Sequence, residues 1–75
     1  MQPYGNRGGD SGVSAYECGP DFIRVQFITG AVYLHNYASC GANNCETMKR
    51  LAADGHGLNG FINSVVREGY ARQER

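Results

Sequence analysis

Alternation of apolar and polar residues predicts a β-hairpin in the middle of the chain. In the segment FIRVQFI, residues 22–28, apolar positions alternate with Arg24 and Gln26, which is the period of a half-buried strand. A Thr-Gly pair then turns the chain into GAVYLHNY, residues 30–37, a second strand. A shorter strand-like run over residues 13–18 precedes both, before a Gly-Pro-Asp turn. Together these runs predict a three-stranded antiparallel β-meander.

The turn between the second and third strands decides which face of the third is buried, because a slip of one residue exchanges the faces. A two-residue turn would pair Val25 with Leu34 and bury the aliphatic series. A three-residue turn ending in a left-handed Gly30 would pair Val25 with Tyr33 and bury the rings of Tyr33 and His35. Thr is a poor first residue for the tighter turn, whereas Gly suits the bulged one. The sequence thus favours rings that face the helices, with their polar tips at the sheet edge.

In the second half of the chain, apolar residues recur at helical spacing and predict two short helices. Asn43, followed three residues later by Glu46, resembles a capping box, and Gly55 suits the end of that helix. Asn59 is expected to cap a second helix that stops at Gly69. The predicted fold class is therefore α+β, with the meander followed by two short helices packed on one face. The apolar helical positions are Cys45, Met48, Leu51 and Ala52, then Phe61, Ile62, Val65 and Val66.

Length and composition indicate one small domain. The 75 residues are 41% hydrophobic and carry no formal net charge, which fits a folded domain with a single compact core. Residues 1–12 are rich in Gly and polar residues without periodicity and are expected to form a flexible N-terminal arm. Residues 13–71 then form the domain, and residues 72–75 a C-terminal tail.

Several classes of protein are disfavoured. No apolar run approaches the length of a membrane span and no signal pattern opens the chain, so a cytoplasmic protein without a membrane partner is expected. The odd set of Cys18, Cys40 and Cys45 favours reduced thiols. A C-x4-C pair without a second pair predicts no metal site, and Cys45 is expected to be buried and inert. Cys40 lacks an evident base and orienting group, so neither catalysis nor a cofactor is predicted.

One set of side chains suits a nucleotide-type ligand. Rings stack on nucleobases, Arg stacks on rings or binds phosphate, and His and Asn hydrogen-bond polar edges. The ordinary alternative is that the tyrosines are core residues with solvated hydroxyl groups. A glycine-rich segment, residues 55–60, resembles an anion loop but is better explained as a connection between helices. The candidate ligand-binding residues are Arg24, Tyr33, His35, Asn63, Arg67 and Tyr70.

Two spaced motifs resemble a known family. The hairpin has the form apolar-x-Val-x-Phe-x-x-Gly-x-x-Tyr, from Ile23 to Tyr33, and the tail has the form Asn-x-x-apolar-Arg-x-x-Tyr, from Asn63 to Tyr70. Over residues 14–70 the chain is thus similar to the KTSR domain, a short domain found alone or at the C-terminus of some lysyl-tRNA synthetases. That family carries a central Tyr-x-Tyr, where this chain has Tyr-Leu-His. The resemblance implies a bacterial or phage-type protein and RNA binding.

The combined expectation is a non-catalytic binding module for a nucleotide-type ligand, either RNA or a small or cyclic nucleotide. A neutral net charge favours a compact ligand over a long duplex. The alternative is a protein–protein interaction module, such as a small phage-type inhibitor of a host protein or a self-associating subunit, because a small domain often completes its core by forming a homo-oligomer.

Overall fold

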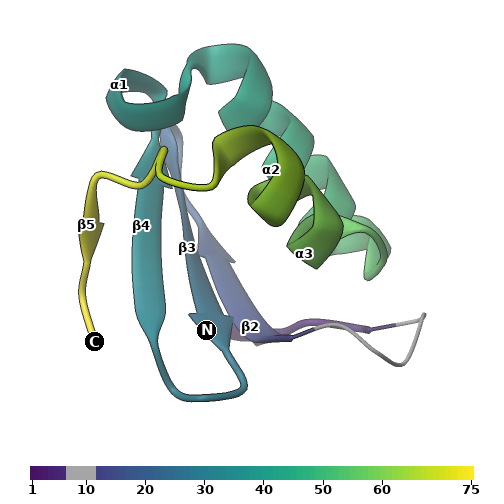
Figure 1. The fold of residues 1–75 in the computed structure, drawn as a ribbon. Helices are drawn as coiled ribbons and strands as arrows, with labels where there is room; N and C mark the ends of the chain where they lie inside the picture. Colours follow the sequence, from purple (N-terminus) through teal and green to yellow (C-terminus); the bar gives the residue numbers. More distant parts are fainter. Residues whose placement is uncertain (7–11) are drawn as a thin grey trace.

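The computed structural model describes residues 1–6 and 12–75, which form an antiparallel sheet of five strands with helices against it (Figure 1). The strands lie in the order of the sequence. None of the described helices is long and apolar enough to cross a membrane. The strands are β1 (Gln2–Pro3), β2 (Val13–Cys18), β3 (Phe22–Phe27), β4 (Val32–Asn36) and β5 (Arg72–Gln73), and the helices are α1 (Tyr37–Cys40), α2 (Ala42–Asp54), α3 (Leu58–Phe61) and the π-helical segment η1 (Ile62–Val66).

The helices cover one face of the sheet, and the core lies between the two layers (Figure 1). Strand β3 contributes alternate side chains to this core, as its pattern predicts, whereas β2 contributes Val13 and Tyr16, which are three residues apart because the pairing register shifts between Val13 and Ala15. Helix α2 contributes Cys45, Met48 and Ala52, which lie on one helical face. The α+β class, the antiparallel meander and the placement of the helices are thus as expected. The core residues are Tyr4, Val13, Tyr16, Ile23, Val25, Cys45, Met48, Ala52, Leu58, Ile62 and Val66.

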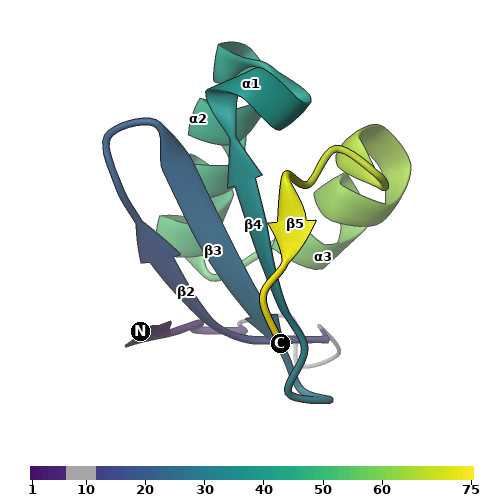
Figure 2. The ribbon, with the colours of Figure 1, turned by 90° about the vertical axis from the view of Figure 1, so that its left-hand side faces the viewer.

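Both ends of the chain extend the sheet, which the expected three strands did not include. Gln2 pairs with Tyr16 in β2, and Tyr4 is buried, its hydroxyl accepting the Leu58 amide at 3.3 Å. The prediction of a flexible arm is therefore wrong for residues 1–6, while residues 7–11 lie outside the described residues. At the other end, part of the expected tail forms β5 beside β4 (Figure 2).

The hairpin takes the register that the three-residue turn predicts. Val25 pairs with Tyr33, and the Phe27 amide donates to the Ala31 carbonyl at 2.9 Å. Gly30 has a φ of 95°, a conformation that residues with a side chain rarely adopt. Tyr33 and His35 consequently lie on the same face as Val25, toward the helices.

The opposite face of β4 is also covered. Val32 and Leu34 are only 6% and 8% exposed, although they point away from the helices. Long polar side chains shield them, since Arg24 lies opposite Leu34 and its Nε donates to Glu74 Oε1 at 2.7 Å. The stems of such side chains cover apolar surface while their charged ends stay in water. The strand is thus buried on both faces.

The helix ends differ from the predicted caps. Asn36, at the end of β4, caps α1 by accepting the Ser39 amide at 2.8 Å, while the Ser39 hydroxyl accepts the Asn36 amide at 3.0 Å. Asn43 and Asn59, the predicted caps, lie inside α2 and α3 instead. Gly55 does end α2 in the left-handed conformation, with a φ of 72°, as predicted.

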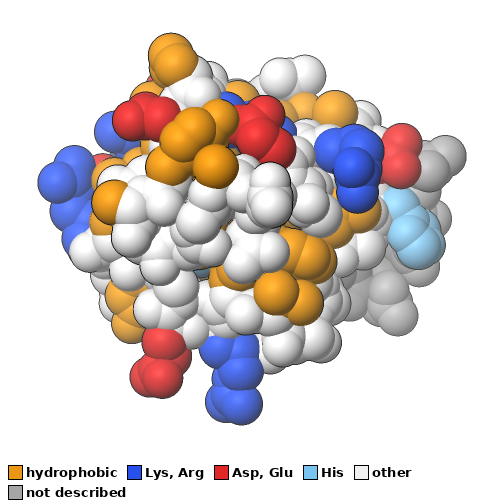
Figure 3. Space-filling view, turned by 90° about the horizontal axis from the view of Figure 1, so that it is seen from above, with side chains coloured by type: hydrophobic (Ala, Val, Ile, Leu, Met, Phe, Trp, Pro, Cys, Tyr) orange, Lys and Arg blue, Asp and Glu red, His pale blue; other side chains and the backbone are white. Residues whose placement is uncertain are grey.

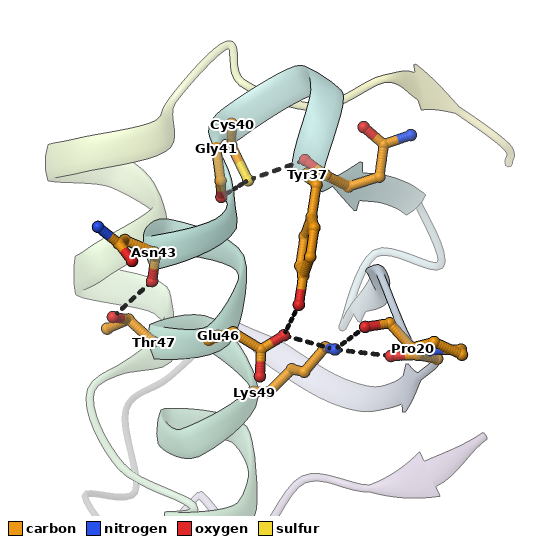
Figure 4. Close-up of polar contacts among 10 residues, drawn as sticks. Pro20, Tyr37, Cys40, Gly41, Asn43, Glu46, Thr47 and Lys49 are labelled. Atoms are coloured by element: carbon orange, nitrogen blue, oxygen red, sulfur yellow. Dashed lines mark hydrogen bonds and ion pairs between the residues drawn. The ribbon is translucent and has the colours of Figure 1, made fainter.

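A cationic contact joins α2 to the turn between β2 and β3 (Figure 4). Lys49 Nζ donates to the Gly19 carbonyl at 2.6 Å, the Pro20 carbonyl at 3.1 Å and Glu46 Oε2 at 2.8 Å. The Tyr37 hydroxyl donates to the same Glu46 oxygen at 2.7 Å. Both partners lower the pKa of Glu46, Lys49 more strongly than Tyr37. Lys49, the one lysine of the chain, thus binds α2 to the turn between β2 and β3.

Substitution of Gly55 tests the packing of the N-terminal segment. A Cβ at this left-handed position would lie 3.1 Å from the Gly5 Cα. We therefore expect Gly55→Ala to lower the free energy of unfolding by about 2 kcal/mol, measured by urea denaturation. The control is Gly60→Ala, because a Cβ at that helical glycine meets no atom within 4 Å and should be neutral or slightly stabilising. Equal stability of the two variants would contradict the packing of residues 1–6 on the end of α2.

Candidate functional site

A cleft of about 680 Å³ lies between the β3–β4 hairpin and the segment that runs from η1 to Tyr70. We call it the hairpin cleft. Its floor comes from the hairpin and its opposite wall from η1 and the residues that follow. The lining residues are Phe27, Thr29, Ala31, Tyr33, His35, Ile62, Asn63, Arg67, Glu68 and Tyr70.

Five of the six candidate residues from the sequence lie in this lining. Tyr33 and His35 come from alternate positions of β4, while Asn63, Arg67 and Tyr70 come from a segment about thirty residues away. The fold thus brings together two motifs that are separate in the sequence. That these residues bind a ligand stays a prediction.

Arg24 does not belong to the cleft. It lies on the far face of the sheet, where it forms ion pairs with Glu74 at 2.7 Å and Glu17 at 3.7 Å and its guanidinium carbon lies 4.7 Å from the Phe22 ring centroid. Its strand neighbour Val25 faces the core, and successive side chains of a strand point to opposite faces. The structure therefore places Arg24, a predicted site residue, outside the cleft that Tyr33 lines.

Aromatic rings from the two sides of the cleft contact one another. The Tyr33 and Tyr70 ring centroids are 4.8 Å apart at an interplanar angle of 61°, and Phe27 meets the other side of Tyr33 at 5.7 Å. Tyr70 also contacts the His35 ring, with centroids 6.2 Å apart. These edge-to-face arrangements are favourable for aromatic pairs. Tyr33 is half-buried and Tyr70 is 38% exposed, so Tyr70 is the more accessible of the two rings.

His35 is buried without a hydrogen-bond partner. The residue is 1% exposed, and neither Nδ1 nor Nε2 has a partner among the described residues. Desolvation lowers the pKa of His35 from 6.5 to about 4, so its ring is neutral at neutral pH. An unsatisfied buried polar group costs about 1–3 kcal/mol. Phe or Leu would avoid this cost, so the buried imidazole is the polar group of the cleft that most needs a hydrogen-bond partner.

The π-helical geometry of η1 presents the other polar groups. Ile62 and Val66, four residues apart, are buried, and Asn63 and Arg67, each one residue later, line the cleft. Side chains at this spacing lie on the same side of a helix. Val65, expected on the apolar face, is instead 54% exposed. Single π-helical turns are frequent at functional sites, although no feature of the sequence predicted one here.

The cleft also contains residues that the motifs did not single out. Phe27 and Ala31 follow from the hairpin register, since they lie on the face of Val25 and Tyr33. Thr29 belongs to the turn itself. Glu68, adjacent to Arg67, adds a carboxylate whose presence neither periodicity nor motif indicated. The lining therefore includes one cation and one anion among the described residues.

Other candidate chemistry stays outside the cleft. Cys40 ends α1, where the thiol donates to the Asn36 carbonyl at 3.4 Å, and burial raises its pKa. Burial of Cys45 raises its pKa to about 11. In the glycine-rich segment, the Leu58 amide is already bound by Tyr4. Within residues 1–6 and 12–75, no three His, Cys, Asp or Glu side chains cluster as metal ligands.

Comparisons with protein-family models, with curated proteins and with solved structures gave no match to this chain. The similarity to KTSR domains therefore stays a prediction that rests on the two motifs. Function has to be inferred from the hairpin cleft itself.

The burial of His35 predicts an acid-sensitive fold. Its folded pKa of about 4 lies below its unfolded value of 6.5, so its contribution to stability is complete above pH 6.5 and decreases as the pH falls toward 4. The unfolding free energy should fall by up to about 1.4 kcal/mol per pH unit in this window. Hydrogen-bond partners lower the pKa values of Glu46 and Glu74 from 4.5, so these two carboxyl groups change the stability only below that pH.

Denaturation at a series of pH values measures this slope. We expect His35→Phe to reduce it between pH 6.5 and 4.5, and His56→Gln, at an exposed position, to retain it. An unchanged slope in the His35 variant would contradict the burial of a neutral ring.

Removal of the Tyr70 ring should expose His35. In Tyr70→Ala, we expect the pKa of His35 to rise from about 4 toward 6.5, because desolvation is the cause of its depression. NMR titration of the imidazole protons measures this value. The control is Tyr37→Ala, since Tyr37 has the same 38% exposure but lies outside the cleft. A rise in the control, or none in Tyr70→Ala, would show that Tyr70 is not the cover of His35.

Proposed function

We propose that this protein is a non-catalytic binding module for a nucleotide-type ligand held in the hairpin cleft. The observation that carries the proposal is His35, a buried neutral imidazole without a hydrogen-bond partner among the described residues, beneath a wall of tyrosines. A neutral imidazole offers one donor and one acceptor. The polar edge of a nucleobase can use either of them.

The other lining groups match the rest of a nucleotide. Tyr33 and Tyr70 offer ring surfaces on which a base can stack, and such stacking is worth about 1–3 kcal/mol per base. Arg67 is exposed and has no ion-pair partner among the described residues, so it is available to a phosphate. A volume of about 680 Å³ is in the range of small-molecule sites, about 300–1,000 Å³.

Binding requires the Tyr70 ring to move. Both ring nitrogens of His35 are buried, and Tyr70 lies against both His35 and Tyr33. Tyr70 belongs to the connection between η1 and β5, outside any helix or strand. We propose that a base takes the place of the Tyr70 ring against Tyr33, and that its edge then reaches His35. Tyr70 would close over the base from the other side.

The surface supports a compact ligand more than a long nucleic acid. Acidic and basic side chains are interspersed on the face seen in Figure 3, with exposed hydrophobic atoms between them. Ion pairs already engage Arg24, Lys49 and Arg72. A polynucleotide backbone normally needs a continuous row of free cations. Similarity to KTSR domains and a cytoplasmic location accord with this proposal.

A protein–protein module is the second proposal, supported by exposed apolar side chains. Ile28, at the hairpin turn, is 71% exposed, and Val65 is 54% exposed. Edge-to-edge pairing of sheets has less support, because both edge strands have only two residues. Sedimentation over a range of concentrations tests self-association, and a constant monomer mass would remove that version of the proposal.

Titration of the labelled protein with nucleotides and short RNA tests nucleotide binding. We expect saturable backbone amide shifts at Tyr33, His35, Arg67 and Tyr70, and Arg67→Ala should weaken binding by about tenfold or more. The control is Arg50→Ala, because Arg50 is exposed on α2, lies outside the cleft and has no ion pair with any residue that the structure describes. Absence of shifts at the cleft with millimolar ligand, or equal losses in the two variants, would refute the proposal.

A further inference from the structure

We propose that the hairpin cleft selects a mononucleotide whose phosphate carries a single negative charge, as in a cyclic phosphodiester, with the phosphate at Arg67 and an uncharged edge of the base at His35. This inference rests on the proposed function and adds a charge state and an orientation to the ligand. The charge state follows from the charged residues that line the cleft, and the orientation follows from the burial of His35.

The charged groups of the lining balance one another. Arg67 contributes one positive charge and the adjacent Glu68 one negative charge, and neither forms an ion pair within the described part of the chain. Both side chains are exposed. A ligand anion that binds Arg67 therefore also experiences repulsion from Glu68.

The repulsion increases with ligand charge. A phosphodiester carries one negative charge, whereas a terminal phosphate monoester carries about 1.5 to 2 at neutral pH, and a triphosphate carries more. One guanidinium can match the first of these charges. Any further negative charge on the phosphate is repelled by Glu68, and the described lining has no second cation to balance it. A cyclic mononucleotide is therefore favoured over the corresponding 5′-monophosphate and triphosphate.

His35 determines the orientation. Its ring is enclosed by the sheet and Tyr70, so the low-polarity environment at that end penalises a phosphate. Its neutral nitrogens suit the uncharged donors and acceptors of a base instead. Arg67, at the exposed rim, is the solvated end where a phosphate keeps part of its hydration. A nucleotide with its base at His35 and its phosphate at Arg67 therefore suits both ends of the cleft.

A longer chain of phosphodiesters has no comparable support. Of the described cations, Arg24 and Arg72 lie on or beside the far face of the sheet, and both are paired with Glu74. Lys49 is occupied by Glu46 and two turn carbonyls. The phosphates that flank a bound nucleotide in RNA would therefore find few free cations. The structure therefore favours a free cyclic nucleotide over a nucleotide within RNA as the ligand.

Calorimetric titration of the 75-residue chain compares cyclic AMP and cyclic GMP with AMP, GMP, ATP, the dinucleotide ApA and an oligoadenylate. We expect at least one cyclic nucleotide to bind more tightly than its own 5′-monophosphate, and the triphosphate to bind most weakly. Glu68→Gln should strengthen monophosphate binding by about threefold more than cyclic-nucleotide binding. The exposed position of Glu68 makes loss of folding in this variant unexpected, and thermal unfolding checks it.

The outcomes separate the two proposals. Binding of monophosphate or triphosphate as tightly as the cyclic form, with a ratio that Glu68→Gln leaves unchanged, overturns the charge selection but leaves the nucleotide site standing. If ApA or the oligoadenylate binds more tightly than either cyclic nucleotide, the site is assigned to RNA and the proposal of a cyclic-nucleotide ligand is refuted. No binding of any probe by the folded protein refutes the proposed function, and this inference with it.

Discussion

The pairing of Val25 with Tyr33 is the constraint on which the rest of the structure depends. A bulged turn at Gly30 sets this register, and a shift of one residue would turn Tyr33 and His35 away from the helices. In the observed register, β4 directs its rings toward η1 and its aliphatic residues toward the far face. The helical layer then has a floor of rings over which the hairpin cleft forms.

The burial of His35 links stability to the proposed ligand. A strand position that faces a small core would ordinarily hold an apolar residue, which would stabilise the fold without an unsatisfied polar atom. The chain instead retains a neutral imidazole in contact with Tyr70, the more accessible of the two tyrosines. A ligand that hydrogen-bonds the imidazole would recover part of this cost. The free energy of such binding would thus include stabilisation that the free protein lacks.

Much of the fold could be predicted from the sequence, because the central strands and α2 have clear periodicity. The ends could not, since Gln2–Pro3 and Arg72–Gln73 are too short to show a pattern and are ordered by pairing with neighbouring strands. The predicted cap at Asn43 was wrong because α1 precedes α2 and leaves Gly41 as the N-cap of α2, and the cap at Asn59 was wrong because α3 begins at Leu58, after Gly57.

The candidate site was predictable to a similar extent. Five of its residues followed from ring and polar chemistry, whereas Arg24 could have been excluded from the preferred register alone, because it adjoins inward-facing Val25. Glu68 was missed because no periodic or motif signal distinguishes one exposed carboxylate from another. Its importance becomes visible only when the fold places it beside Arg67 in the lining of a cleft.

The central claim is that the ring of His35 is the buried polar contact of a ligand in the hairpin cleft. The most direct measurement is a long-range proton–nitrogen NMR spectrum of the imidazole, recorded without ligand and then with cyclic nucleotide to saturation. We predict ring nitrogen signals of a neutral imidazole that shift as one of the nitrogens gains a hydrogen bond. Saturable binding that leaves both His35 nitrogen signals in place would contradict the account.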